Sequence, residues 1–118
     1  MAETALQGVD AATLAALHDD AMRLGARLRA AFPGSWRDRL DPAARATVTI
    51  AALLASTQLM EAMSWLLRAQ SGRMSPSPAW HAGRATAAAA LGPERGAVAA
   101  GIDRLYARVI ATDAAARA

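Results

Sequence analysis

The feature that most constrains the fold is an uninterrupted helical stretch of thirty residues from Asp41 to Gln70. It opens with an aspartate followed by a proline, a pair typical of a helix start because aspartate caps the first amides and proline lacks an amide hydrogen. No glycine or proline follows until Gly72. At ~1.5 Å per residue such a helix is roughly 40 Å long, more than one side of a small domain can cover. We therefore predict that it is the central helix of a bundle.

The composition favours one all-α domain. Aromatic residues make up 4% of the 118 residues, alanine dominates the apolar fraction, and valine and isoleucine are few, so strands are poorly supported. There is no cysteine, which excludes disulfide and thiolate chemistry. The N-terminus is acidic and lacks the long apolar core of a signal peptide. The charge-free run 46–60 is too short to span a membrane. We therefore expect a cytoplasmic protein without a membrane partner.

Helical spacing of apolar residues predicts two further helices, one on each side of the central one. The first runs from about 10 to 31 and is ended by Pro33-Gly34. The third runs from about 93 to 116, with a proline suited to its first position. Between the central helix, about 42–70, and the third lies an irregular connection, 71–92. The sequence therefore predicts a single domain, 1–118, folded as an up-down-up three-helix bundle.

At ~100° per residue, the central helix divides into two apolar stripes. We expect the wider stripe to form the core: Val48, Ala52, Leu53, Leu59, Met60, Met63, Leu66 and Leu67. The second stripe is the candidate protein-interaction site: Ile50, Leu54, Glu61, Trp65 and Arg68. Exposed apolar surface of this kind usually marks association, and we expect Trp65 to anchor a homodimer. The alternative is that the connection, with Met74 and Trp80, folds back and covers this stripe.

Motifs that would indicate catalysis or metal binding are missing from the sequence. His18 has no second ligand at helical spacing, and His81 lies in the connection without a partner. The carboxylates show no paired spacing, and there is no glycine-rich phosphate loop or nucleophile motif. We therefore expect no enzyme activity, no metal site and no cofactor.

Two other kinds of binding remain open. Six arginines in residues 23–45 could contact the phosphates of a nucleic acid: Arg23, Arg27, Arg29, Arg37, Arg39 and Arg45. Interleaved acidic residues make a solvated surface the simpler interpretation of these arginines. A small molecule could bind at Met60, Met63 and Trp65, although methionines at helical spacing are usually core residues.

Three segments resemble the RcdA-like family, named for the bacterial regulator of CtrA degradation. Asp41-Pro42-Ala43 resembles the start of the family's long helix. Thr57 to Gln70, with Trp65-Leu66-Leu67, resembles the centre of that helix. Leu105 to Val109, followed by Asp113, resembles the last helix. With the length and the order of elements, the resemblance covers about two thirds of the chain.

The resemblance implies a dimeric three-helix bundle without catalytic residues, acting as an adaptor that delivers cell-cycle regulators to the ClpXP protease. The sequence departs from the family where Leu54 and Gln58 replace two arginines, and where an Ala/Ser/Pro-rich 71–92 replaces a longer charged connection. These departures bear on the delivery partner more than on the fold. We therefore expect a homodimeric adaptor whose partners are itself and a ClpXP-linked adaptor or substrate. The alternative is a nucleic-acid-associated regulator using residues 23–45.

Overall fold

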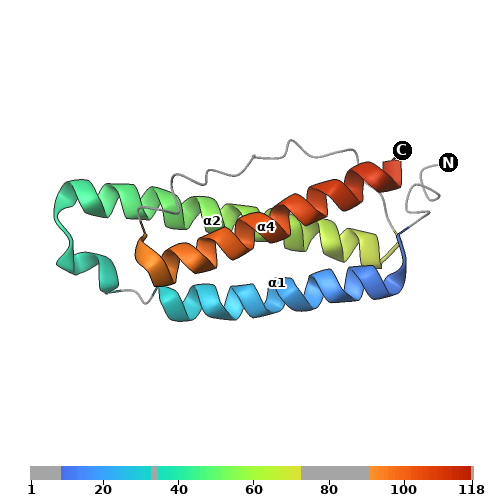
Figure 1. Cartoon of the computed structure of the whole chain (residues 1–118), viewed down its shortest axis with the longest axis horizontal. Helices are drawn as coiled ribbons and strands as arrows, with labels where there is room; N and C mark the ends of the chain where they lie inside the picture. Colours follow the sequence, from blue (N-terminus) through green and yellow to red (C-terminus); the bar gives the residue numbers. More distant parts are fainter. Residues whose placement is uncertain (1–8, 33–34, 73–90, 118) are drawn as a thin grey trace.

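The computed structural model describes residues 9–32, 35–72 and 91–117 (Figure 1). These residues form three long helices, α1 (Ala11–Ala31), α2 (Pro42–Gln70) and α4 (Gly92–Arg117), and a 3-10 turn, η2 (Trp36–Arg39), between α1 and α2. Each long helix contacts the other two, which confirms the predicted three-helix bundle. Most of the predicted irregular connection, 71–92, lies outside the described residues.

The direction of the last helix differs from the predicted up-down-up order, because α4 runs parallel to α2 (Figure 1). Gln58 donates a hydrogen bond to Asp103, and Trp65 donates one to Asp113. The contacts therefore advance in the same direction along both helices. The helix α4 is instead antiparallel to α1. Parallel neighbours in a bundle need a long crossover connection, which gives a physical reason for the length of chain between α2 and α4.

Aspartate caps begin the first two helices. The side chain of Asp10 accepts a hydrogen bond from the Thr13 amide at 2.6 Å, and that of Asp41 accepts one from the Ala44 amide at 2.8 Å. Proline stands at the first position of α2. The backbone and hydroxyl hydrogen bonds from Thr13 lower the pKa of Asp10, because they stabilise its charged form. These local interactions explain why both helices begin where they do.

Glycine shapes the far end of α2 and the start of α4. Gly72 and Gly92 have φ angles of 79° and 82°, a left-handed conformation that side chains rarely adopt. At Gly72 the chain leaves α2 after its amide has bonded to the Ala69 carbonyl. Near the start of α4, the Arg95 side chain donates to the Ala31 carbonyl at 2.7 Å and so ties α4 to the end of α1.

Each helix contributes one apolar stripe to a common core. The core includes Leu14, Leu17 and Leu24 of α1, Val48, Leu59 and Leu66 of α2, and Val98, Ile102, Leu105 and Val109 of α4. At Gly101 the helices α1 and α4 approach closely, since a Cβ there would lie 3.0 Å from Leu24 Cδ2. The core therefore depends on small residues at the helix crossings as well as on large ones in the stripes.

The apolar character of α2 also meets the length and composition criteria for a helix that crosses a membrane. Of the window that meets them, 39% is buried inside the bundle. The core helix of a helical bundle passes the same criteria.

Candidate interaction surfaces

The five residues predicted as an interaction site on α2 do not share one surface. Ile50 is 66% exposed, and Arg68 is also exposed. Leu54 and Glu61 are half-buried, whereas Trp65 is only 3% exposed. The prediction that Trp65 is an exposed anchor is therefore wrong.

Trp65 is buried because α4 packs against the side of α2 that carries it. Its indole Nε1 donates to Asp113 Oδ1 at 2.9 Å. Arg117 Nε donates to the same carboxylate oxygen, also at 2.9 Å. Asp113 is itself only 2% exposed, so the indole and the guanidinium satisfy a carboxylate that would be costly to bury alone. The partner of Trp65 lies on another helix, which is why the pattern of α2 alone does not reveal the burial.

Two further polar pairs cross the same interface. Gln58 Nε2 donates to Asp103 Oδ1 at 3.0 Å, and the Tyr106 hydroxyl donates to the Glu61 carboxylate. We call this set of pairs the polar seam, and it comprises Gln58, Glu61 and Trp65 of α2 with Asp103, Tyr106 and Asp113 of α4. Buried polar pairs have strict geometry, so the seam favours one register of α4 against α2.

The exposed apolar side chains of α2 lie away from the seam. Leu53, Met60 and Leu67 are 62%, 71% and 57% exposed, and with Ile50 they form what we call the outer face. These three were expected in the core, and that expectation is wrong. The side chains that replace them at the helix contacts are mostly alanines: Ala51, Ala55, Ala62 and Ala69. Because alanine side chains are small, the helix axes can lie close together at these positions. The larger Leu53, Met60 and Leu67 lie on the exposed side of α2 instead.

An apolar groove of about 410 Å³ lies between α1 and α2, next to the outer face. Its lining includes Met22 of α1 and Met60, Met63 and Leu67 of α2. Met22 is 53% exposed, so the groove extends the apolar surface onto α1. Of the residues considered for a small molecule, Met60 and Met63 meet here, but Trp65 lies in the polar seam instead.

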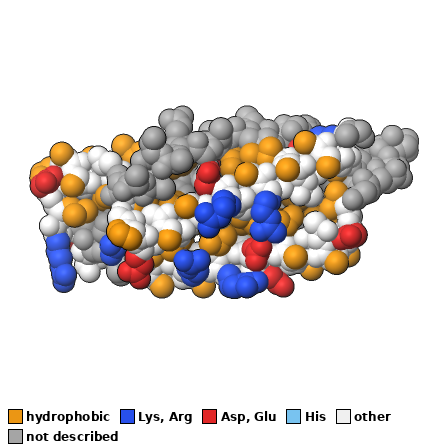
Figure 2. Space-filling view, viewed as in Figure 1, with side chains coloured by type: hydrophobic (Ala, Val, Ile, Leu, Met, Phe, Trp, Pro, Cys, Tyr) orange, Lys and Arg blue, Asp and Glu red, His pale blue; other side chains and the backbone are white. Residues whose placement is uncertain are grey.

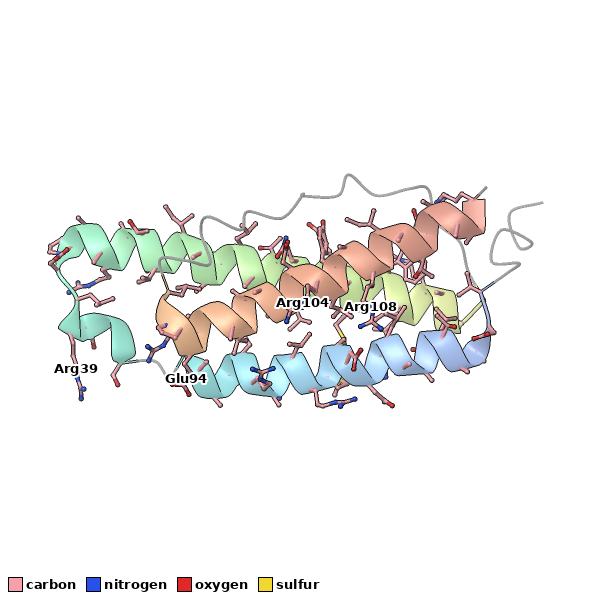
Figure 3. All side chains as sticks on the ribbon, viewed as in Figure 1. Arg39, Glu94, Arg104 and Arg108 are labelled. Atoms are coloured by element: carbon pink, nitrogen blue, oxygen red, sulfur yellow. The ribbon has the colours of Figure 1, made fainter. Side chains whose placement is uncertain are left out.

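A second groove, of about 260 Å³, lies between α1 and α4 and is lined by four arginines. We call it the arginine groove, and its charged residues are Asp20, Arg23, Arg27, Arg104 and Arg108. Figure 2 shows basic and acidic side chains gathered over α1 and α4 on this side of the bundle. In Figure 3 the side chains of Arg104 and Arg108 extend from α4 toward α1.

The arginines of residues 23–45 do not form one cluster. Arg23 and Arg27 line the arginine groove, whereas Arg29 lines the apolar groove. Arg45 donates to the Leu40 carbonyl at 3.1 Å, and Arg39 is exposed at the end of η2 (Figure 3). The Arg37 side chain lies outside the described residues. The positive surface that the structure does assemble needs Arg104 and Arg108, which the sequence pattern did not connect with α1.

The histidines and acidic residues give no sign of a metal centre in the ranges that the structure describes. There, no three His, Asp or Glu side chains are grouped so that they could hold an ion. His18 is half-buried on α1, and His81 lies outside the described residues. Met74 and Trp80, considered as a cover for α2, also lie outside them.

Over the described ranges, the fold and these surfaces define an all-α three-helix bundle with an apolar groove, an arginine groove and an exposed apolar helix face. A family profile described as "Protein of unknown function (DUF1465)" matches residues 6–117. The chain therefore belongs to the DUF1465 family. No curated protein and no solved structure matches the chain at a significant level.

Proposed function

We propose that this protein is a non-enzymatic interaction protein that pairs with a second copy of itself through the outer face of α2. We further propose that it is an adaptor or regulator in ClpXP-dependent proteolysis linked to bacterial cell-cycle control. The observation that carries the proposal is the exposure of Leu53, Met60 and Leu67 on one side of the central helix. The resemblance of three segments to the RcdA-like family, described above, supports the adaptor role.

The outer face has the spacing of a helix-pairing surface. Leu53, Met60 and Leu67 recur every seven residues, the interval that keeps side chains along one seam of two paired helices. The smaller Thr57 and Ser64 lie between them and leave room for side chains of the opposite helix. An interaction between two copies needs only one self-complementary patch.

Symmetry makes this face compatible with an antiparallel pair centred on Met60. Leu53 and Leu67 are equally far from Met60 in the sequence, so Leu53 of each copy would meet Leu67 of the other. Glu61 is the only charged residue between Arg45 and Arg68, and it is bonded to Tyr106 in the polar seam. A second copy would therefore bury apolar and small polar side chains with little charge to desolvate.

The departures from the RcdA-like pattern leave this face unchanged. Gln58, which replaces a family arginine, is 2% exposed and belongs to the polar seam. Leu54, which replaces the other, is half-buried. Both substitutions therefore affect packing against neighbouring helices, while the exposed leucines and methionine remain available for self-association.

Sedimentation equilibrium at micromolar concentration tests the pairing. We expect the wild type to be a dimer and Met60→Glu to be a monomer, because the variant places a charge at the centre of the apolar contact. Ala107→Glu is the matched control, since it adds the same charge at an exposed position of α4. A monomeric wild type, or a Met60→Glu variant that remains dimeric, would contradict the pairing.

A separate experiment tests the adaptor role. The wild type and Met60→Glu are captured from the native bacterium, and the co-purified ClpX is quantified for each. We expect more ClpX to co-purify with the wild type than with an unrelated protein. We also expect the half-lives of cell-cycle regulators to increase when the protein is deleted. Unchanged lifetimes and no ClpX enrichment would contradict the adaptor role while leaving the dimer intact, so the two parts can fail independently.

A further inference from the structure

The arginine groove contains a carboxylate bridge between α1 and α4. Asp20 Oδ1 lies 3.3 Å from Arg23 Nη2, and Asp20 Oδ2 lies 2.9 Å from Arg108 Nη1. One carboxylate thus joins an arginine of its own helix to an arginine of the antiparallel neighbour. Because two ionised hydrogen bonds converge on it, this arrangement shows how the groove holds a negative group.

One helical turn further along, the same arrangement recurs without the carboxylate. Arg27 follows Arg23 by four residues, and Arg104 precedes Arg108 by four residues. In an antiparallel helix pair these shifts move both arginines in the same spatial direction, so Arg27 and Arg104 are equivalent to the bridged pair. At the position equivalent to Asp20 stands Leu24, which cannot accept a hydrogen bond.

Both arginines of this second pair are exposed and line the groove. Within the described ranges, neither has a carboxylate at ion-pair distance. The guanidinium of Arg104 lies close to Gly101, since its Nη2 would be 3.8 Å from a Cβ there. Two positive side chains that share a groove repel each other, and an anion placed between them removes that repulsion.

The floor of the groove favours a peptide as the source of that anion. Leu24 and Leu105 line it with Gly101; these leucines are only 9% and 1% exposed, so the apolar floor is small and lies directly beside the arginines. A peptide can present a carboxylate and an apolar side chain together, whereas a nucleic-acid backbone presents phosphate and sugar. Planar guanidinium groups also match a carboxylate through paired hydrogen bonds.

We propose that the arginine groove binds an acidic peptide segment of a partner protein, with one carboxylate held between Arg27 and Arg104 as Asp20 is held between Arg23 and Arg108. This site lies between α1 and α4 and does not depend on pairing through the outer face of α2. It extends the proposed function by adding a second interaction surface with a defined ligand chemistry.

Fluorescence anisotropy with a labelled Glu-Glu-Leu-Glu-Glu-Leu peptide tests the site at physiological salt. We expect the Arg27→Gln/Arg104→Gln variant to bind roughly tenfold more weakly or worse, because it loses charged hydrogen bonds. Arg39→Gln/Arg68→Gln is the matched control, since it removes two exposed arginines elsewhere, and its affinity should stay within about twofold of the wild type. Far-UV circular dichroism checks that both variants are folded.

A third variant tests the internal bridge. Asp20→Asn releases Arg23 and Arg108 for an external carboxylate, so we expect it to bind the peptide more tightly than the wild type. Equal binding by the wild type and the Arg27→Gln/Arg104→Gln variant would overturn the proposal, as would no binding by either. Tighter binding of single-stranded oligothymidylate with the same dependence on these arginines would overturn it in favour of nucleic acid.

Discussion

Two sides of α2 each carry several residues whose polarity is the opposite of that expected for their surroundings. The side that faces α4 includes a buried glutamine, a half-buried glutamate and a buried tryptophan, which form hydrogen bonds across the polar seam. The side that faces away is exposed and includes Ile50, Leu53, Met60 and Leu67. A helix wheel of α2 alone would therefore assign several of these residues to the wrong surroundings.

The difference teaches that burial in this bundle depends on which neighbour a position meets. Polar side chains are tolerated inside because each has a partner on α4, and a paired polar group costs far less to bury than an unpaired one. Apolar side chains are left outside because small alanines occupy the close contacts. If the outer face binds a second copy, both sides of α2 are interfaces, one within the chain and one between chains.

The largest expected effect is on the buried side. Trp65→Ala should lower the free energy of unfolding by about 3–5 kcal/mol, because it leaves a cavity and removes the indole donor to Asp113. Urea denaturation measures the change, and sedimentation of the folded variant should still show a dimer. A variant of unchanged stability that no longer dimerises would instead restore Trp65 to the outer surface.

Asp113→Ala should have the next largest effect. It removes the acceptor shared by Trp65 and Arg117 and leaves the buried indole hydrogen without that bond, which should cost about 1–3 kcal/mol of unfolding free energy. Asp38→Ala is a suitable control because Asp38 is exposed in η2. Equal stability of the two variants in urea would show that the seam contributes nothing at this end.

Gln58→Ala tests the other end of the seam. The loss of its hydrogen bond to Asp103 should lower the free energy of unfolding by about 1 kcal/mol, the usual net value of one such bond. A double-mutant cycle with Asp103→Ala, measured by urea denaturation, isolates the pair from other effects of each change. A coupling energy of zero would mean that the pair sets no part of the register.

The smallest effect on folding is expected on the outer face. At concentrations where the protein is monomeric, Leu53→Ala/Leu67→Ala should change the free energy of unfolding by only about 0.5 kcal/mol, because both side chains are mostly exposed. The same variant should raise the dimer dissociation constant, measured by sedimentation. A large loss of monomer stability would show that these leucines pack within their own chain.

Much of the fold could be predicted from the sequence because its signals are local. Asp41 and Pro42 mark the start of α2 through a side-chain cap and a fixed φ, whatever the rest of the chain does. The spacing of Leu14, Leu17 and Leu24 identifies the buried stripe of α1. The direction of α4 could not be predicted in this way, because it depends on pairs such as Gln58 with Asp103, which are far apart in sequence.

The candidate surfaces were predicted less well for the same reason. Ile50 was correctly placed outside, but Trp65 was not, since its partner Asp113 lies on α4. The arginine groove was missed because Arg27 and Arg104 come together only when α1 and α4 pack antiparallel. In both helices two arginines lie four residues apart. This matched spacing indicates the arginine groove only once the antiparallel pairing of α1 with α4 is known.

The polar seam between α2 and α4 has a consequence for synthesis on the ribosome. The helices α1 and α2 are made first and can form a hairpin while α4 is still being translated. Until α4 docks, the α2 flank bearing Gln58 and Glu61 is in contact with water, and both side chains can be hydrated there. We therefore expect the nascent hairpin to bind other chains less readily than one with an all-aliphatic flank. When α4 docks, Gln58 and Glu61 exchange their hydrogen bonds to water for hydrogen bonds to α4.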